Sequence, residues 1–252
     1  MNTNSIEKNH SRKQWQYNFI YTSVLGIVGV LSLLQFVIKI IPSKVLLKHS
    51  ISTIIILSLL QSVVFICICA AIGTTLSKRI GFKTIFDEIS STKNSLWMIL
   101  KRQFVYGVPI GIFGAIIAYL IAPDFIAYLN SVPQVSRIFG AIYEEIVIRW
   151  GIMTLIVWTL WRFGQKGVGV PKKSLIWSGI ILSQIIFASG HIFILIKFGI
   201  TNPIWSIVTI FIVSFPWGWL FWKRGIESAI VAHMSFHIFV ILLVAMKLQT
   251  VA

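Results

Sequence analysis

The chain has 252 residues, of which 57% are hydrophobic and only 12% are charged, and its formal net charge is +15. Its mean hydropathy is +0.88. A soluble domain of this length could not hide so much apolar surface from water, so the composition excludes an ordinary soluble protein and indicates a membrane protein.

Apolar stretches long enough to cross a hydrocarbon core of ~30 Å recur along the whole sequence. Backbone groups in lipid must bond to one another, and the sequence lacks the alternation typical of a β-barrel, so we expect helices. The predicted fold class is all-α, a polytopic bundle of about seven transmembrane helices. The predicted spans are residues 15–41, 51–76, 104–121, 139–161, 175–198, 204–222 and 226–246.

Three further features bear on the bundle. The first span is too long for a signal peptide and has no small-residue cleavage site, so we expect a retained anchor. Apolar residues at roughly helical spacing between positions 84 and 100 predict an extra interfacial helix, which would bring the count to eight. Gly107 and Gly111 form a Gly-x-x-x-Gly pattern, which is typical of a close contact between two membrane helices.

The basic residues lie in the loops between the predicted spans and form no single patch, so we expect no nucleic-acid partner. If the N-terminus is cytoplasmic, fifteen of the 22 basic residues, Lys93 among them, fall on the cytoplasmic side. Six fall on the other side, including Lys44 and Lys48. This bias follows the positive-inside rule and predicts a cytoplasmic N-terminus with the C-terminus outside.

The fourth predicted span contains two adjacent glutamates, Glu144 and Glu145, although the whole chain has only seven acidic residues. An ionisable group near the centre of a bilayer costs roughly 2.5–3.5 kcal/mol, and such groups usually mark a proton relay, an ion pathway or a catalytic site. Arg149 follows Glu145 by four residues, so the two share a helix face and can pair. Glu144 lies about 100° around the helix and points elsewhere.

Three of the five histidines also lie in predicted spans: His191 in the fifth, and His233 and His237 in the seventh. The last two are four residues apart, so their imidazoles share one helix face. A single buried histidine is more often a satisfied core residue than a functional one. Three histidines, two glutamates and an arginine in the last four spans are the obvious partners for one another, so we expect a shared site.

These residues, taken in order, resemble the CPBP intramembrane protease family, which includes CAAX prenyl proteases and bacteriocin-processing or Abi proteins. The resemblance covers about residues 139–239. One position departs from the family pattern, because His237 stands where the family often has asparagine. The motifs that carry the resemblance are Glu144-Glu145-x-x-x-Arg149, Phe187-x-x-x-His191, the block from Trp217 to Gly225 with Ser228, and His233 with a residue four positions later.

The resemblance implies hydrolysis of a peptide bond within the membrane, with Glu144 activating a water that His191 orients. It further implies that His233 and His237 bind the developing oxyanion. Glu145, Arg149 and Phe187 would support the site structurally. We therefore expect one compact domain with a cytoplasmic tail (1–14), N-terminal transmembrane helices (15–138) and a catalytic transmembrane core (139–252).

The need for a metal stays open at this point. We prefer a site without a cofactor, because the mechanism that the family resemblance implies needs no metal. Zinc is the alternative, since three protein ligands and an open position for water suffice for a catalytic site. His-x-x-x-His on a helix is also a common ligand spacing. The zinc ligands would be His191, His233, His237 and Glu144.

Two other classes of function compete with the protease. The first is a non-catalytic membrane scaffold or bacteriocin immunity protein with the same fold. The second is a proton-coupled transporter, for which paired inverted repeats would be expected and none is found in the sequence. The expected partners are the lipid bilayer and a peptide or membrane-protein substrate. We expect a multi-pass protein of the cell membrane, namely a bacterial plasma membrane.

Overall fold

The computed structural model describes residues 3–41, 45, 48, 50–92 and 94–251. Within these residues the chain forms helices and no strand, which confirms the predicted all-α fold. Residues 1–2 of the predicted tail, and Lys44 and Lys93 of the charge count, lie outside the described residues. The elements are α1 (Thr3–Ser32), α2 (Leu34–Ile40), α4 (Ile51–Ile80), α5 (Ile85–Ser91), α6 (Leu96–Ile121), α7 (Pro123–Ser131), α8 (Gln134–Glu145), the π-helix η1 (Ile146–Met153), α9 (Thr154–Thr159), the π-helix η2 (Leu160–Gly164), α10 (Lys173–Gly190), α11 (Ile192–Lys197), α12 (Pro203–Arg224) and α13 (Ile226–Val251).

Six of the described helical stretches are long and apolar enough to cross a membrane, and the bent pair of α1 and α2 makes a seventh if it is one span. The prediction of about seven spans is therefore confirmed. The extra helix predicted between residues 84 and 100 is divided, because α5 ends at Ser91 and α6 already begins at Leu96. The six stretches are Ile51–Ser91, Leu96–Ile121, Gln134–Gly164, Lys173–Lys197, Pro203–Arg224 and Ile226–Met246.

A glycine determines where α4 ends, and a threonine determines where α5 begins. Gly81 ends α4 with φ at 79°, a left-handed conformation that glycine adopts without steric cost. Thr84 then caps α5, since its side chain accepts a hydrogen bond from the Asp87 backbone while the Asp87 side chain accepts one from the Thr84 backbone. This capping box satisfies two backbone donors that the helix itself leaves free.

The most extensive helix contact among the described residues joins α6 to α13. A Cβ atom at Gly107 would come within 2.9 Å of the Ser228 carbonyl oxygen. One at Gly111 would meet the α13 backbone at Ala232 even more closely. The two glycines therefore let the helices approach along the surface that the Gly-x-x-x-Gly pattern predicts. Because α13 carries two of the histidines, this contact fixes their position in the bundle.

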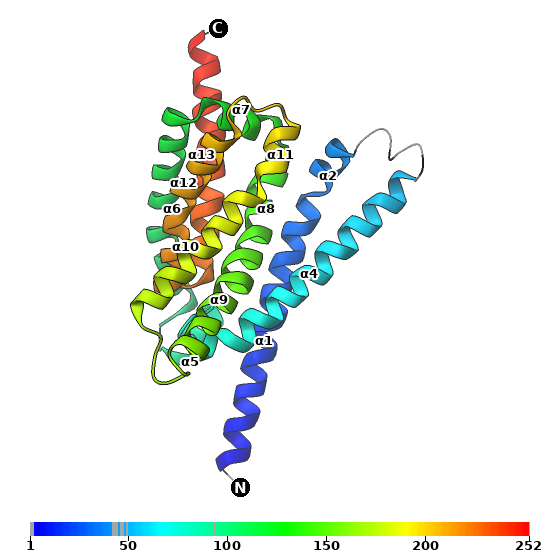
Figure 1. Cartoon of the computed structure of the whole chain (residues 1–252). Coiled ribbons are helices and arrows are strands. Elements are labelled where there is room, and N and C mark those ends of the chain that lie inside the picture. The colour runs from blue at the N-terminus through cyan, green and yellow to red at the C-terminus, as the bar shows by residue number, and fades with distance from the viewer. Residues whose placement is uncertain (1–2, 42–44, 46–47, 49, 93, 252) are drawn as a thin grey trace.

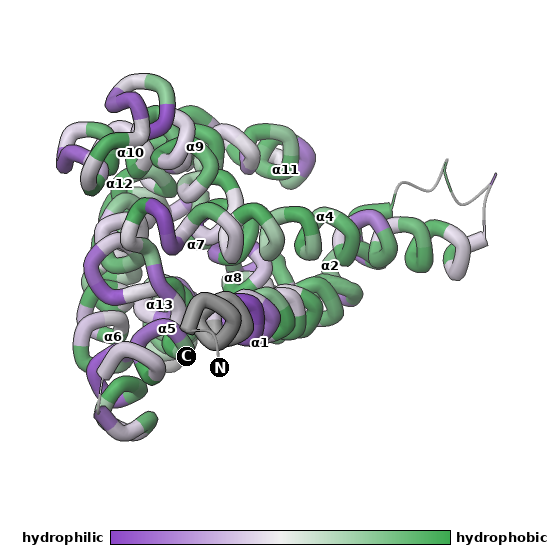
Figure 2. Tube along the Cα trace, turned by 90° about the horizontal axis from the view of Figure 1, so that it is seen from below, coloured by the Kyte–Doolittle hydropathy of each residue, from purple (hydrophilic) through white to green (hydrophobic). Residues whose placement is uncertain are grey.

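The helix α4 leans away from the bundle toward its N-terminal end, together with α2 (Figure 1). Its C-terminal half is buried against α1 and η1, where Gly73 lies against Trp150 and Cys69 lies against Gly151. Its N-terminal half is apolar and exposed, as at Ile56 with 62% of its surface accessible (Figure 2). An apolar face of this size on a membrane helix is a lipid-facing surface.

Candidate active site

The structure brings together the site residues predicted from the sequence. Glu144 and Glu145 end α8, and Arg149 lies in η1, directly behind them. His191 lies at the junction of α10 and α11, while His233 and His237 are in the middle of α13. The predicted site residues therefore lie close together in space, on elements of the last four spans.

The fourth span changes its helical register immediately after the two glutamates. Residues Ile146–Met153 form a π-helix, and the side chain of Thr154 donates to the Arg149 carbonyl oxygen at 3.1 Å. Stretches of π-helix are rare and frequently occur at functional sites. The wider turns of this π-helix lie between the two glutamates and α9, where the span continues as a regular α-helix.

Glu145 is a fully buried carboxylate held from two sides. Its Oε2 lies 3.4 Å from Arg149 Nε, which confirms the predicted ion pair. The pair lacks a well-aligned hydrogen bond at this distance, so its attraction is chiefly that of the two charges. Its Oε1 accepts a hydrogen bond from His233 Nδ1 at 3.0 Å. Glu145 thus connects the arginine to the histidine of α13.

Two polar residues that the sequence analysis missed complete the surroundings of Arg149. Its Nη2 donates to Gln184 Oε1 at 2.8 Å and to the Ser214 carbonyl oxygen at 3.2 Å. Gln184 also donates to the Ser214 hydroxyl. Gln184 is an amide in a mainly apolar span, and that could have marked it, whereas Ser214 is one of several hydroxyl residues in α12. A buried charge needs such partners, because unpaired it would cost several kcal/mol.

Glu144 lies between two imidazoles. Its Oε1 is 3.9 Å from His191 Nε2, and its Oε2 is 3.5 Å from His233 Nε2. Its side chain is 32% exposed, whereas that of His233 is 3% exposed. Glu144 is therefore the carboxylate of the pair that faces open space, as its rotation around the helix predicts.

The other ring nitrogens decide what the two imidazoles can do. His191 Nδ1 lies 2.9 Å from the Phe187 carbonyl oxygen, which can only accept, so Nδ1 carries the hydrogen. His233 Nδ1 likewise donates to the Glu145 carboxylate. In the neutral ring, the Nε2 of each is then an acceptor directed at Glu144. A group that binds between the two Nε2 atoms must therefore donate hydrogen bonds, and a water molecule can donate one to each.

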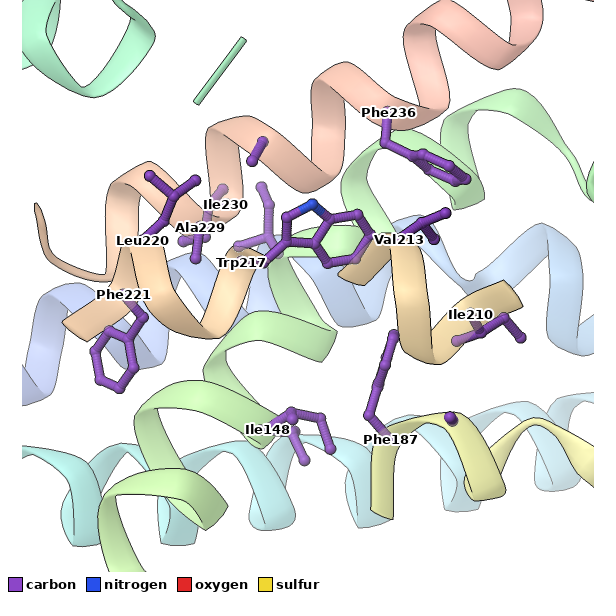
Figure 3. Close-up of a cluster of buried hydrophobic side chains, with 14 of the residues drawn as sticks. Ile148, Phe187, Ile210, Val213, Trp217, Leu220, Phe221, Ala229, Ile230 and Phe236 are labelled. Carbon is purple, nitrogen blue, oxygen red and sulfur yellow. The ribbon is translucent and has the colours of Figure 1, made fainter. Parts of the chain in front are cut away.

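Aromatic rings fix the orientation of the histidines. The Trp217 ring stacks on His233 at a centroid distance of 4.0 Å. Phe187 presents its edge to His191 at 4.9 Å and to His233 at 6.0 Å, and the Arg149 guanidinium lies 5.2 Å from its ring centre. Figure 3 shows Trp217 and Phe187 facing each other across the core, with Val213 and Ile210 beside them. Locked rings leave the Nε2 atoms little freedom to turn away from Glu144.

His237 stacks on His233 at a centroid distance of 5.0 Å and is 8% exposed. Its Nδ1 is buried without a hydrogen-bond partner among the described residues. A buried polar atom without a partner is unusual in a native protein and calls for an explanation, such as a catalytic role. His237 also lines the same cavity as Glu144, so a bound group could reach it.

Two openings meet at Glu144. The first is a cavity of about 90 Å³ among α7, α8, α12 and α13, lined mostly by apolar side chains. The second is an apolar groove of about 470 Å³ between α4, η1 and α10. Glu144, His191 and Tyr128 line both. Burial, with the Glu144 charge adding to it, raises the pKa of the Tyr128 hydroxyl above its ordinary value, so this hydroxyl remains protonated and can donate.

The residues proposed as zinc ligands do not converge on one point. Among the described residues, no group of three or more histidine, cysteine or acidic side chains is arranged to hold a metal ion. The bonded Nδ1 atoms of His191 and His233 leave only the Nε2 of each for a metal, and both Nε2 atoms lie near the Glu144 carboxylate. As arranged, the described side chains therefore do not make up a three-ligand zinc site.

Comparison with known proteins locates the resemblance in the same part of the chain. The family model described as type II CAAX prenyl endopeptidase Rce1-like matches residues 134–239. No curated protein and no solved structure matched the chain. The match begins at the first residue of α8 and ends in α13, so it encloses every residue that surrounds Glu144 in α8, η1, α10, α12 and α13. Over residues 134–239 the chain thus matches the Rce1-like type II CAAX prenyl endopeptidase family, which confirms the resemblance predicted from its motifs.

Proposed function

We propose that this protein is an intramembrane endopeptidase in which Glu144 activates a water molecule to hydrolyse a peptide bond of a membrane-associated substrate. The observation that carries the proposal is the position of Glu144, a carboxylate at the meeting point of two openings with two imidazole acceptors beside it. The family match supports a protease and a protein substrate.

The water would lie between Glu144 and His191, where the distance of 3.9 Å is too long for a direct hydrogen bond. Polar groups separated by more than 3.5 Å are often bridged by water. As the water oxygen attacks the carbonyl carbon of the substrate, Glu144 takes one of its protons. The carbon–nitrogen bond then breaks, and Glu144 passes that proton to the leaving amine. Such general base catalysis contributes typically 10²–10⁴-fold to the rate.

The negative charge that develops on the carbonyl oxygen needs a donor. We propose that His233 and His237 supply it, because both rings line the cavity and His237 Nδ1 has no partner among the described residues. A donor directed at such an oxyanion is worth roughly 3–4 kcal/mol in the transition state. His233 would have to present a protonated Nε2 for this step, with Glu145 stabilising the imidazolium through Nδ1.

The remaining buried groups keep these rings in place. Glu145 holds the His233 tautomer through Nδ1, and Arg149 pairs with Glu145 from behind. Phe187 lies between the guanidinium and the two imidazoles. Glu145 and Arg149 line neither opening, and Phe187 presents only an apolar ring to both, so we assign all three a positioning role.

The test compares membrane peptides by mass spectrometry in cells that carry the wild-type protein or Glu144→Gln. Glutamine keeps the shape of the side chain and removes the base, so we expect cleavage products to fall by at least roughly 100-fold. Glu227→Gln is the matched control, because Glu227 is another buried glutamate, accepts from the Ile85 backbone and lines neither opening. Unchanged peptide pools on loss of Glu144 would instead support a membrane scaffold of the same fold.

A further inference from the structure

Three basic side chains lie close together at the end of the bundle where α5 lies (Figure 1). Lys83 is in the loop between α4 and α5, Arg102 is in the second turn of α6, and Arg224 ends α12. The Gln103 side chain donates to the Arg224 carbonyl oxygen at 3.4 Å, and the Ile226 amide donates to the Lys83 carbonyl oxygen at 3.3 Å. None of the three basic residues lines either opening described above. They form a cationic cluster separate from the candidate active site.

The cationic cluster has one carboxylate within ion-pair distance among the described residues. Glu88 is buried and pairs with Arg102, and its Oε2 lies 3.8 Å from Lys83 Nζ. Arg224 takes part in no ion pair between described side chains. Its guanidinium carbon lies 3.9 Å from the centre of the Tyr106 ring, and its Nε is buried without a hydrogen-bond partner among the described residues. A buried donor of this kind calls for an explanation.

The other carboxylates nearby are used by backbone and amide groups. Asp87 accepts hydrogen bonds from the Asn18 side chain and the Thr84 backbone, and Glu227 accepts one from the Ile85 backbone. At this end, α4, α5, α6, α12 and the first turn of α13 contribute seven basic residues against three acidic ones. The basic residues are Lys78, Arg79, Lys83, Lys101, Arg102, Lys223 and Arg224, and the acidic ones are Asp87, Glu88 and Glu227. An anion from outside the chain would therefore be attracted to this end of the bundle.

An exposed apolar face of α6 continues from the cationic cluster along the bundle. Val105 and Tyr106 follow Arg102 by three and four residues. Phe113 follows it by eleven residues, so all of them lie on one helix face. Val105 and Phe113 are more than half exposed. Eleven residues span about 16 Å along the helix axis, which is roughly half of a hydrocarbon core of ~30 Å. A molecule bound here would contact cations at one end and an apolar surface over the depth of one leaflet.

We propose that the cationic cluster binds the phosphate of an anionic phospholipid whose acyl chains lie on this face of α6. A guanidinium presents planar donors that match phosphate oxygens, and basic pockets between membrane helices bind anionic headgroups. The phosphate would be the counter-ion that Arg224 lacks among the described side chains. A free phosphate ion offers the same charge, but it would leave the apolar face of α6 without an occupant. The site needs no peptide substrate, so it does not depend on the proposed hydrolysis.

The test uses the purified full chain in a neutral detergent, to which phosphatidylglycerol or phosphatidylcholine with identical acyl chains is added. Both lipids carry a phosphate, but the choline group neutralises its charge. Native mass spectrometry measures the bound lipid as its concentration rises. We expect the wild type to bind phosphatidylglycerol at least about tenfold more tightly, since a hydrogen bond between charged groups is worth that much. Inorganic phosphate at the same concentration should not displace the lipid, and displacement would assign the cluster to a free anion and overturn the proposal.

Arg224→Gln should weaken binding of phosphatidylglycerol about tenfold and leave binding of phosphatidylcholine unchanged, and Arg224→Lys should keep part of the preference. Arg162→Gln is the matched control, because it removes an exposed arginine of η2 outside the cluster and should keep the full preference. Arg102 stays in place, because its loss would leave the buried Glu88 with Lys83 alone. The proposal is overturned if the wild type binds both lipids equally, if Arg224→Gln keeps the preference, or if Arg162→Gln loses as much of it.

Thermal unfolding of the wild type gives a second readout, which needs no variant to fold. Phosphatidylglycerol should raise the unfolding temperature more than phosphatidylcholine does, because a ligand that binds only the folded protein stabilises it. High salt should reduce this difference, since the attraction is between charges at a partly exposed site. Equal unfolding temperatures with the two lipids at low salt would overturn the proposal. Glu144→Gln should keep the lipid preference of the wild type, so failure of the proposed hydrolysis would be distinguishable from failure of the lipid site.

Discussion

Glu144 and Glu145 are neighbours in sequence with opposite surroundings. Glu145 is fully buried, paired with Arg149 and bonded to His233. The Glu144 side chain is 32% exposed, with only Nε2 atoms within ion-pair distance. One carboxylate is therefore committed to the protein, and the other is available to a bound water. Adjacent positions on a helix point about 100° apart, and this is sufficient to give two identical side chains different surroundings.

Removal of Arg149 should be worse than removal of the whole ion pair. Arg149→Met leaves the Glu145 carboxylate buried without its cation, a loss of roughly 3–5 kcal/mol in comparable cases. The double variant Glu145→Gln with Arg149→Met leaves no lone charge, so more folded protein should be recovered than with Arg149→Met alone. Fluorescence-detected size-exclusion chromatography after detergent extraction measures this, and equal recovery of both variants would argue against the pair.

His237 distinguishes oxyanion binding from metal binding. If its ring donates to the oxyanion, His237→Asn keeps a donor and should retain most activity, whereas His237→Ala should lose roughly 100-fold. The metal content of the purified protein should not change in either variant. Loss of activity in His237→Asn together with loss of stoichiometric zinc would replace the metal-free mechanism with a zinc-dependent one.

Sequence reasoning at this scale found the groups that are unusual for a membrane span and missed those that are ordinary. Two glutamates, an arginine and three histidines are conspicuous among apolar residues. Gln184 and Ser214 are uncharged and common in spans, so nothing in the sequence linked them to Arg149 from 35 and 65 residues away. Arg137 was assigned to a loop, because the predicted fourth span began at residue 139 whereas α8 begins at Gln134. The helices that pack most on α8 are α1 and α13, so the burial of Arg137 could not be predicted from α8 alone.

At the scale of elements, the position of the candidate histidines of α13 depends on helix contacts remote from them. The α13 helix is held by α6 through Gly107 and Gly111, and by α8 and α12 on its other sides. The Gly-x-x-x-Gly pattern predicted that this surface of α6 contacts another helix, but it did not identify α13 as that helix. The π-helix η1 was not predicted, because its sequence is an ordinary apolar run and its register follows from packing against α4 and α10.

Gly111→Val should separate α6 from α13 and displace His233 and His237. The added side chain would meet the α13 backbone at Ala232, which cannot turn aside as a flexible side chain can. Overpacking of this kind costs typically 1–3 kcal/mol, so the unfolding temperature and the activity should both fall. Gly164→Ala is the control, because a Cβ there meets nothing within 4 Å. Wild-type activity in Gly111→Val would show that the contact does not position the site.

At the scale of the whole molecule, the site lies nearer one end of the bundle. The N-terminus and α5 are at one end, and the C-terminus, α7 and α11 are at the other (Figure 1). The cavity is lined in part by α7, so it belongs to the second end. Basic residues such as Arg79, Lys101 and Arg224 belong to helix ends at the first. If the chain has the orientation that the charge bias predicts, the cavity lies toward the outer face.

Cysteine labelling tests this orientation in intact cells. In a background in which Cys67 and Cys69 are replaced by alanine, a membrane-impermeant maleimide should label Ser131→Cys. Lys13→Cys and Lys172→Cys should be labelled only after the membrane is opened. The opposite pattern would reverse the orientation and turn the cavity toward the cytoplasm.

The number and class of the helices could be predicted because the bilayer imposes one length and one kind of backbone pairing on every span. Their arrangement could not, because lipid-facing and protein-facing apolar residues look alike in a sequence. Ile56 and Ile66 are both isoleucines of α4, but Ile56 is 62% exposed and Ile66 is 0% exposed. The difference arises because the N-terminal half of α4 leans away from the bundle.

The meeting of the 90 Å³ cavity and the 470 Å³ groove at Glu144 has a consequence for how reaction products leave. If the protein hydrolyses a peptide bond as proposed, one chain becomes two fragments, and each fragment would have an opening of its own. Neither fragment then has to wait for the other, so the order of release would be random. Added fragments of the two kinds would inhibit without excluding each other. Where release limits turnover, as it does in many enzymes, the slower of two independent departures would set the rate.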